Sequence, residues 1–394
     1  MRTADVVIIG GGVMGSSIAW HLREDGVTGP IVMIERDPTY ARASSDRAMG
    51  GIRQQFTSAV NVALVRHSVR FWRVFDGRMS VGDHVAKARF RPRGYLFLAN
   101  DTNATALERR LVRMREAGAR VERLEPAEVT RRWPGLATDD LRFAVFGPED
   151  GYANPRQVLR GFRAAALARG VEYAADEAVE ITREGAHVTG VRLATGGSIA
   201  SSVVVIAAGA WSAAIGRTAG IELPIVPQRQ HLFRAALPEP WPYRFPMTVD
   251  PTGVHWRHED DDRGSTRDTI IVARTRADEP AGEAMEPDLD LWGRDFRPPL
   301  VRRAPGLDSA ELVEGWAGLY EVTPDHNPLI GAHPAVGGLH VAAGFSGHGL
   351  MMSPAIGQVM SEIIRLGHAR LTDVGMLAPD RFERGEPFED GAMI

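Results

Sequence analysis

The chain contains 394 residues, of which 44% are apolar and 24% are charged, and it carries a net charge of −4. This length exceeds the size at which one hydrophobic core stops growing, so we expect a globular protein with two domains. The charge balance argues against nucleic acid or an anionic membrane as a partner, and the absence of cysteine excludes disulfides and thiolate metal sites. No apolar run approaches the roughly 18 residues of a membrane span and no signal-peptide pattern opens the chain, so we expect a cytoplasmic protein.

The N-terminal segment predicts a strand, a helix and a second strand. Residues 5–9 include four consecutive β-branched side chains, which is typical of a parallel strand buried on both faces. Gly10 to Gly15 follows and fits the pattern G-x-G-x-x-G, and a helix with apolar residues at fourfold spacing comes next. A second apolar run, residues 31–34, ends at Glu35. The order of these elements predicts a βαβ unit.

Each glycine of this motif has a physical role in a dinucleotide site. Gly10 allows a tight turn, Gly12 lets the backbone approach a pyrophosphate, and Gly15 allows close packing of helix and strand. The helix N-terminus favours phosphate groups, and Glu35 can accept hydrogen bonds from ribose hydroxyls. The motif therefore predicts a bound dinucleotide. NAD and FAD both remain open at this point, whereas Glu35 disfavours NADP.

The rest of the chain alternates between α/β and β-rich segments. Helices are predicted over 58–76, 103–118 and from Asn154 to about Arg169, and strands over 142–146, 171–181, 186–194 and 198–207. Between residues 223 and 322, short runs broken by Pro, Gly and acidic turns indicate an antiparallel sheet. A strand over 339–343 and a final helix close the chain, with Ser353 predicted as the N-cap of that helix and Pro354 as its first residue.

This alternation predicts an α/β fold in which a Rossmann-like domain carries an inserted antiparallel-sheet (α+β) domain. The dinucleotide-binding domain would be discontinuous and would consist of residues 1–88, 146–222 and 324–394. The inserted domain, residues 89–145 and 223–323, would hold the substrate.

Two later stretches place small residues at the end of a strand. Residues 203–206 run into the small residues 207–210 and then Trp211, which would let a flat ligand lie close, although ordinary tight packing explains the pattern equally well. Gly344 to Gly349 precedes the last helix, and its backbone N–H groups could face a developing negative charge. A second dinucleotide-contacting strand is typical of flavoproteins and is not needed by simple NAD dehydrogenases. His348 taken alone reads as a packed or capping histidine.

One further cluster contains the residue types that bind metal ions. His255, His258 and Glu259 are followed by Asp260 to Asp262. Because they fall between two strand-like runs, we interpret them as a solvated hairpin tip and expect no metal site.

Together these stretches resemble the FAD-dependent amine and amino-acid oxidoreductases of the D-amino-acid oxidase superfamily. The most similar branch contains sarcosine oxidase, dimethylglycine dehydrogenase, glycine oxidase and D-amino-acid dehydrogenase. The matching segments follow the family's order along the chain and are the glycine motif, residues 43–45 with 50–53, 207–211, 318–320 with 323–325, and 343–349.

The resemblance implies a noncatalytic set of residues around FAD and a smaller catalytic set. In the FAD set, the residues at the ADP half would be Gly10, Gly12, Val13, Met14, Gly15, Glu35, Arg36, Ser44 and Ser45, with Val179 near adenine. Those along the cofactor would be Ala207, Gly209 and Trp211, and those at the flavin edge Gly50, Gly51 and Gly318. The polar end of the ring would be surrounded by Gly344, Ser346, Gly347, His348, Gly349 and Met351. In the catalytic set, Arg53 would pair with a substrate carboxylate, for which a guanidinium fork is suited, Tyr320 would line the substrate side of the ring, and His348 would lie beside it.

Three departures from the family pattern are informative. The cysteine that tethers flavin in sarcosine-oxidase-like enzymes would stand at Gly318, and the histidine of the dimethylglycine branch near residues 46–49; neither is present, so we expect noncovalent FAD. A second carboxylate-binding lysine of the family falls at Met351. The lysine associated with oxygen activation would lie near residues 270–274, where this chain has none.

The expected reaction is oxidation of an amine or amino-acid C–N bond, with secondary or N-methyl amines favoured and O2 or another electron acceptor as co-substrate. The α-hydrogen would move as hydride to flavin N5 and leave an imine that hydrolyses. Oxidation of a 2-hydroxy acid on the same scaffold would need a base, for which His348 or a histidine of the inserted sheet is the evident source. A third reading is a flavoprotein assembly or interaction factor, a role of some relatives that resemble this chain around residues 51–56. The sequence leaves the oligomeric state open.

Overall fold

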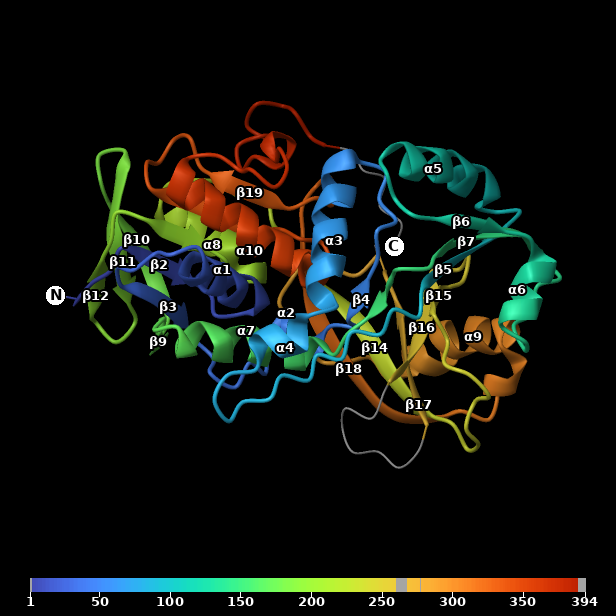
Figure 1. Cartoon of the computed structure of the whole chain (residues 1–394). Coiled ribbons are helices and arrows are strands. Elements are labelled where there is room, and N and C mark those ends of the chain that lie inside the picture. The colour runs from blue at the N-terminus through green and yellow to red at the C-terminus, as the bar shows by residue number, and fades with distance from the viewer. Residues whose placement is uncertain (1, 260–267, 277, 389–394) are drawn as a thin grey trace.

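The structure is a computed structural model that describes residues 2–259, 268–276 and 278–388. Figure 1 shows sheets at both ends of an elongated molecule, with helices between and around them. A four-stranded outer sheet lies at the N-terminal end, and a six-stranded parallel sheet follows it. An eight-stranded large sheet forms the opposite end, and a small two-stranded sheet, β4 (Gly51–Ile52) with β8 (Gly151–Tyr152), lies between the parallel and large sheets.

The parallel sheet contains the predicted βαβ unit. Its strands, in spatial order, are β19 (Leu329–Ala332), β20 (Leu339–Ala343), β13 (Val204–Ile206), β2 (Val6–Ile9), β3 (Ile31–Glu35) and β9 (Glu172–Ala175). All neighbouring strands are parallel except β19 and β20. The central strands are apolar throughout because helices and the outer sheet cover both faces. Helix α1 (Val13–Glu24) packs against α10 (Gly349–Leu366) on one of these faces.

The outer sheet corrects two strand predictions. Its order is β1 (Arg2–Thr3), β12 (Ser198–Ala200), β11 (His187–Leu193) and β10 (Ala178–Glu184). The runs 171–181 and 198–207 are therefore not single strands, because each is divided between this sheet and the parallel sheet. The first run bends at Asp176, whose side chain accepts a hydrogen bond from the Glu177 N–H at 2.7 Å. Ser201 turns the second, where its hydroxyl bonds with both the carbonyl and the N–H of Val203.

The large sheet is mainly antiparallel, as predicted for residues 223–322. Its strands in order are β18 (Glu311–Val322), β14 (Val226–Ala236), β17 (Thr269–Arg274), β16 (Val254–Glu259), β15 (Met247–Val249), β5 (Tyr95–Asn100), β7 (Leu141–Gly147) and β6 (Glu122–Leu124). Only β15 and β5 pair in parallel. Its outer face packs against a helical segment that the sequence analysis missed, a π-turn over Trp292–Phe296 continued by α9 (Arg297–Arg303).

The histidine cluster does not form a hairpin tip, so that interpretation was wrong. His255 and His258 both lie within β16 and are buried. The strand continues through these polar residues because His258 accepts a hydrogen bond from the Phe245 N–H at 2.9 Å and stacks on the Phe245 ring. Asp260 to Asp262 lie outside the described residues. Among the residues that are described, no group of three Asp, Glu or His side chains is arranged to hold a metal ion.

The predicted helices are present, with caps that fit their sequences. Residues 58–76 form α3 (Ala59–Trp72), capped by Ser58, which accepts from the Asn61 N–H, and then α4 (Phe75–Met79). Asn154 likewise caps α7 by accepting from the Gln157 N–H. The remaining helices are α2 (Ser44–Arg47), α5 (Ala104–Glu116), α6 (Pro126–Arg132), α7 (Pro155–Ala168) and α8 (Ser212–Thr218), with 3-10 turns at Gly209–Trp211, Pro305–Leu307 and Gly375–Leu377.

Helix α10 begins earlier than predicted. His348 is its N-cap, and Pro354 lies inside the helix. A proline there has no N–H for the carbonyl of Leu350, but the Ser353 hydroxyl donates to that same carbonyl at 2.9 Å. Ser353 therefore compensates for the proline within the helix and does not cap it. As a result, the helix N-terminus lies one turn closer to the segment 344–348.

The domain division stays a prediction, and the strands of the two larger sheets are distributed over its segments as follows. Every strand of the parallel sheet falls within 1–88, 146–222 and 324–394, and the strands of the large sheet fall within 89–145 and 223–323, apart from β7, which crosses residue 145. Within the part of the chain that the structure describes, no helix has the length and apolar character needed to cross a membrane.

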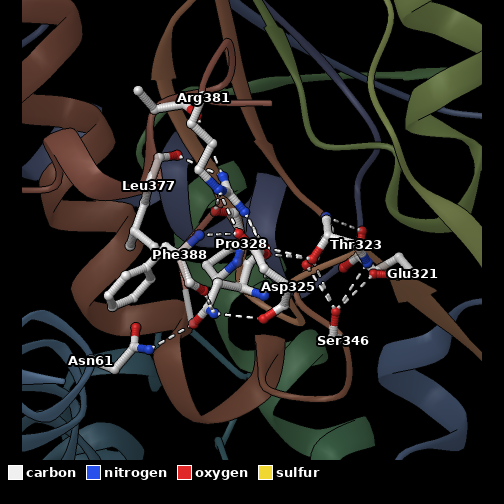
Figure 2. A network of polar contacts seen from close by, with 12 residues as sticks. Asn61, Glu321, Thr323, Asp325, Pro328, Ser346, Leu377, Arg381 and Phe388 are labelled. Atoms are coloured by element: carbon white, nitrogen blue, oxygen red, sulfur yellow. Dashed lines mark hydrogen bonds and ion pairs between the residues drawn. The ribbon is translucent and has the colours of Figure 1, made fainter. Parts of the chain in front are cut away.

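A buried ion pair ties the C-terminal segment to the loop between β18 and β19, as Figure 2 shows. Asp325 and Arg381 are 2.8 Å apart and at most 2% exposed. Asp325 also accepts from the Phe388 N–H, and the Asn327 amide donates to the Phe388 carbonyl. Thr323 links this network to Ser346 through their hydroxyls. The network therefore anchors the loop 344–348 through Ser346.

We predict that Arg381→Met lowers the free energy of unfolding by about 3–5 kcal/mol, because it leaves the Asp325 carboxylate buried without its cation. Urea unfolding measures this, with Arg384→Met as the control that should change little, because the Arg384 guanidinium is exposed and its carboxylate partners, Asp380 and Glu386, keep contact with solvent. Burial alone would raise the pKa of Asp325, but the hydrogen bonds of Arg381 and Phe388 hold it below its usual value. The contribution of the pair should therefore be present at neutral pH and lost as the pH falls through that lowered pKa. An unchanged unfolding free energy in Arg381→Met would contradict this assignment.

Candidate active site

A long cavity runs from the carboxyl ends of β2 and β3 to the inner face of the large sheet. This is where ligands bind in open parallel sheets. Most of the residues singled out from the sequence line it. They are Gly10, Gly12, Val13, Met14, Glu35, Arg36, Ser44, Ser45, Gly50, Gly51, Arg53, Ala207, Gly209, Trp211, Gly318, Tyr320, Ser346, Gly347, His348, Gly349 and Met351.

Three of the singled-out residues do not line the cavity. Gly15 lies behind the wall, where an added Cβ would fall 1.9 Å from the Gly10 carbonyl oxygen, so it allows α1 to pack closely on β2. Gly344 also supports the wall, and its N–H donates to Glu321 at 2.9 Å. Val179 points outward and is 38% exposed, whereas its neighbour Ala178 lines the cavity, as the alternation of a strand requires.

The glycine motif forms a cradle of the kind that a pyrophosphate needs. Gly10 has a φ of +105°, and an added Cβ would lie 2.3 Å from the Ala207 oxygen. At Gly12, by contrast, an added Cβ would meet nothing closer than the Ser45 hydroxyl at 3.7 Å. A side chain at Gly12 would therefore project into the cavity without disturbing the protein. This open space at the N-terminus of α1 fits a phosphate group.

Glu35 ends β3 at the same end of the cavity. Its two carboxylate oxygens accept from the N–H groups of Gly11 and Asp37, at 2.8 and 2.9 Å. Burial raises the pKa of Glu35, while these two N–H groups act in the opposite direction. Each oxygen keeps a lone pair that can accept a hydrogen bond from a ribose hydroxyl. Beside it, the guanidinium of Arg36 lies 3.9 Å above the Trp211 ring.

Tyr95, Met247, His255 and Tyr320 line the other end of the cavity from the large sheet. Tyr320 packs so closely on Gly347 that an added Cβ there would fall 2.7 Å from its ring. The sequence analysis assigned Tyr320 but not Tyr95, Met247 or His255. None of the three belongs to the segments that resemble the family, and the pairing of β5, β15 and β16 brings them together.

Arg53 follows β4 and is buried between the two ends of the cavity. Its Nη1 donates to the Gln55 carbonyl at 2.6 Å, and its guanidinium lies 4.4 Å above the Phe56 ring. Its Nη2 lies 3.1 Å from Nε2 of His348. A guanidinium can only donate, so His348 accepts at Nε2 and carries its proton on Nδ1. Burial and the charge of Arg53 hold the pKa of His348 well below its usual value, and the imidazole stays neutral.

Two buried carboxyl groups near the cavity were not found from the sequence. Burial raises the pKa of Asp150 to about 8, while the hydrogen bonds from Gln54 and the charge of Arg53 act in the opposite direction. Burial likewise raises the pKa of Glu321, which lines the cavity, to about 7. Neither residue belongs to a recognisable motif, and only burial distinguishes them from other acidic residues.

Comparisons with known proteins agree with this geometry. Residues 5–363 match the DAO family, whose description is FAD dependent oxidoreductase. The chain belongs to this family, and it is an FAD-dependent oxidoreductase. The predicted fold class, family and cofactor are thereby confirmed.

Relatives cover almost the whole chain. It is 34% identical to the FAD-dependent oxidoreductase domain-containing protein 1 of Xenopus laevis, across 98% of this chain and 83% of that protein. It is 28% identical to the glycine oxidase of Geobacillus kaustophilus (strain HTA426), across 91% of this chain and 92% of that protein. The crystal structure of L-proline dehydrogenase from P. horikoshii superimposes with a TM-score of 0.87 at 28% identity, and the match covers 98% of this chain and 100% of that one.

We predict that Gly12→Val weakens FAD binding by about two orders of magnitude or more, because its side chain fills the space for the pyrophosphate. The FAD-free variant should keep a thermal midpoint within about 2 °C of the FAD-free wild type. Gly10→Val is the matched comparison, since its side chain would meet the Ala207 carbonyl and should destabilise the protein itself. FAD titration and thermal unfolding separate the two effects, and normal FAD affinity in Gly12→Val would contradict the cradle.

We also predict that FAD is held without a covalent bond. The chain has no cysteine, and no histidine stands at residues 46–49. Acid precipitation should therefore release the yellow colour into the supernatant as FAD. Colour that stays with the precipitated protein would show a covalent link.

Proposed function

We propose that this protein oxidises the C–N bond of an amine or amino acid, with secondary or N-methyl amines favoured and O2 as the electron acceptor. The observation that carries this proposal is the buried guanidinium of Arg53, which lines the same cavity as the cofactor-binding segments. A buried cation in such a place favours a substrate with an anionic group. The names of three relatives, L-proline dehydrogenase, glycine oxidase and sarcosine dehydrogenase of Homo sapiens, support an amine or amino acid.

Such a reaction requires few functional groups from the residues that line the cavity. Bound FAD supplies a two-electron acceptor, so that the α-hydrogen leaves the substrate carbon as hydride while the nitrogen lone pair forms the C=N bond of an iminium ion, which water hydrolyses. Arg53 holds the anionic group, and Tyr320 and Met351 close the sides of the cavity and exclude water. The amine must be unprotonated when it reacts, and no strong base is required.

The two histidines of the cavity are poorly suited to serve as the base in the alternative reaction, 2-hydroxy-acid oxidation. It needs a base with a pKa near the working pH to take the hydroxyl proton. Nε2 of His348 is occupied by Arg53, and burial with that charge depresses its pKa. Burial lowers the pKa of His255 to about 4. Both imidazoles are therefore weak bases at neutral pH.

The family pattern has two positions for cations that bind the substrate carboxylate, and in this chain only one of them, Arg53, is a cation. Met351 stands in place of a lysine and is buried in the wall of the cavity. Two arginines of the inserted domain are candidates to replace that lysine. Of these, Arg257 donates to the Met49 carbonyl at 2.7 Å and does not line the cavity. Arg274 does line it. Burying a carboxylate against methionine is costly, so we propose that small amino acids are poor substrates.

Anaerobic mixing of the yellow holoenzyme with a panel of compounds tests the proposed reaction. Loss of the flavin absorbance with amines, and not with matched 2-hydroxy acids, supports amine oxidation. Bleaching by 2-hydroxy acids alone would support the alternative. The absence of bleaching by either class would favour a role as an assembly or interaction factor.

We predict that Arg53→Met lowers kcat/KM for the best carboxylate-bearing amine by about 2–4 kcal/mol of transition-state binding, because a charge-assisted pair is removed. The FAD content should stay that of the wild type. An unchanged kcat/KM would refute the assignment, and loss of FAD would instead show that Arg53 braces the loop after β4.

We predict that amines with a larger apolar body, including N-benzylglycine, which keeps the carboxylate for Arg53, have a higher kcat/KM than sarcosine. The physical reason is the methionine surface at Met351. Met351→Lys should then improve sarcosine turnover relative to the wild type. A clear preference of the wild type for sarcosine would contradict this reading. If that preference were lost in Arg274→Met, Arg274 would be the second cation.

A further inference from the structure

His255 places a buried imidazole in the wall of the cavity, on the side of the large sheet. It lies on β16 in the interior of the large sheet, opposite Val249 of β15 and Ala273 of β17. Residues directly opposite each other in a sheet point to the same face, so these two apolar side chains flank the imidazole. His255 lines the cavity and is 6% exposed. Neither Val249 nor Ala273 has a polar side-chain atom that would bond to the imidazole.

The backbone fixes the tautomer of His255. Its Nδ1 lies 3.0 Å from the carbonyl oxygen of Gly253. A carbonyl can only accept, so Nδ1 carries the hydrogen and Nε2 has a lone pair. Burial lowers the pKa of His255 to about 4, and the charge of Arg53 acts in the same direction. Nε2 is therefore a fixed hydrogen-bond acceptor at neutral pH.

The cavity therefore combines a cationic donor at Arg53 with a neutral acceptor at His255. The charge of Arg53 lies close enough to influence the pKa of His255. A ligand that matches both has an anionic group and an N–H donor. A secondary or primary amine with an acidic group meets this description, whereas a tertiary amine has no N–H when it is unprotonated.

We propose that His255 binds the substrate through Nε2, which accepts a hydrogen bond from the amine N–H, and so selects secondary and primary amines over tertiary ones. This inference rests on the proposed amine oxidation. The N–H becomes more acidic as the C=N bond forms and the nitrogen gains positive charge. The hydrogen bond to His255 then strengthens in the transition state, and the nitrogen lone pair stays free to form the new bond.

Two planar carboxylates that cannot be oxidised in this way test the contact without turnover. Pyrrole-2-carboxylate has a ring N–H where furan-2-carboxylate has an oxygen, and the two are otherwise similar in shape. Each is titrated into the oxidised holoenzyme while the flavin absorbance is followed. The wild type should bind the pyrrole about tenfold more tightly than the furan.

Two variants assign that preference to His255. In His255→Leu the ratio of the two affinities should fall to about one, and in His255→Gln, whose amide oxygen can accept, part of the preference should return. Both variants are compared with the wild type at equal FAD content. The FAD content of each purified variant is measured first, so that a folding defect is detected separately. An unchanged ratio in His255→Leu would overturn the role of His255 and leave the proposed function standing. If neither carboxylate perturbs the flavin of the wild type, the anion site at Arg53 and the inference that depends on it both fail.

Discussion

Arg53 carries a positive charge into the interior at the place where the parallel sheet and the large sheet meet. Burying such a charge costs several kcal/mol unless it is hydrogen-bonded and paired. The surrounding residues reduce this cost with a carbonyl of Gln55, the imidazole of His348 and the face of Phe56. The guanidinium also lines the cavity, so its electrostatic field reaches a ligand bound there. A substrate anion gains most where such a field is least screened.

The two sheets supply different parts of the site for physical reasons. The parallel sheet ends in backbone N–H groups and the N-terminus of α1, which suit phosphates. The large sheet presents alternate side chains on its inner face, and its strand order places Tyr95, Met247, His255 and Tyr320 around one space although they span more than half of the sequence. The helix α10 completes the wall, because its early start places His348 beside Arg53.

The parts of this structure that local rules determine could be predicted from the sequence. The βαβ unit and its glycines depend on neighbours within about thirty residues, and their pattern identified them. The start of α10 could not be predicted in this way, since Ser353 and Pro354 have the sequence of a cap and yet act inside the helix. The division of 198–207 between two sheets depends on which strands lie beside each half. Strand pairing also brings His255 and Glu321 to the cavity, so the local pattern around His255 was misinterpreted as a hairpin tip and Glu321 was missed.

The central claim is that the buried cation of Arg53 recognises an anionic group beside the flavin. Titration of the oxidised holoenzyme with acetate and with acetamide, followed through the flavin absorbance, tests it directly because the two ligands have nearly the same size and differ in charge. The account predicts saturable binding of acetate at least about tenfold tighter than that of acetamide. Equal affinity for the two ligands, or tighter binding of acetamide, would contradict it.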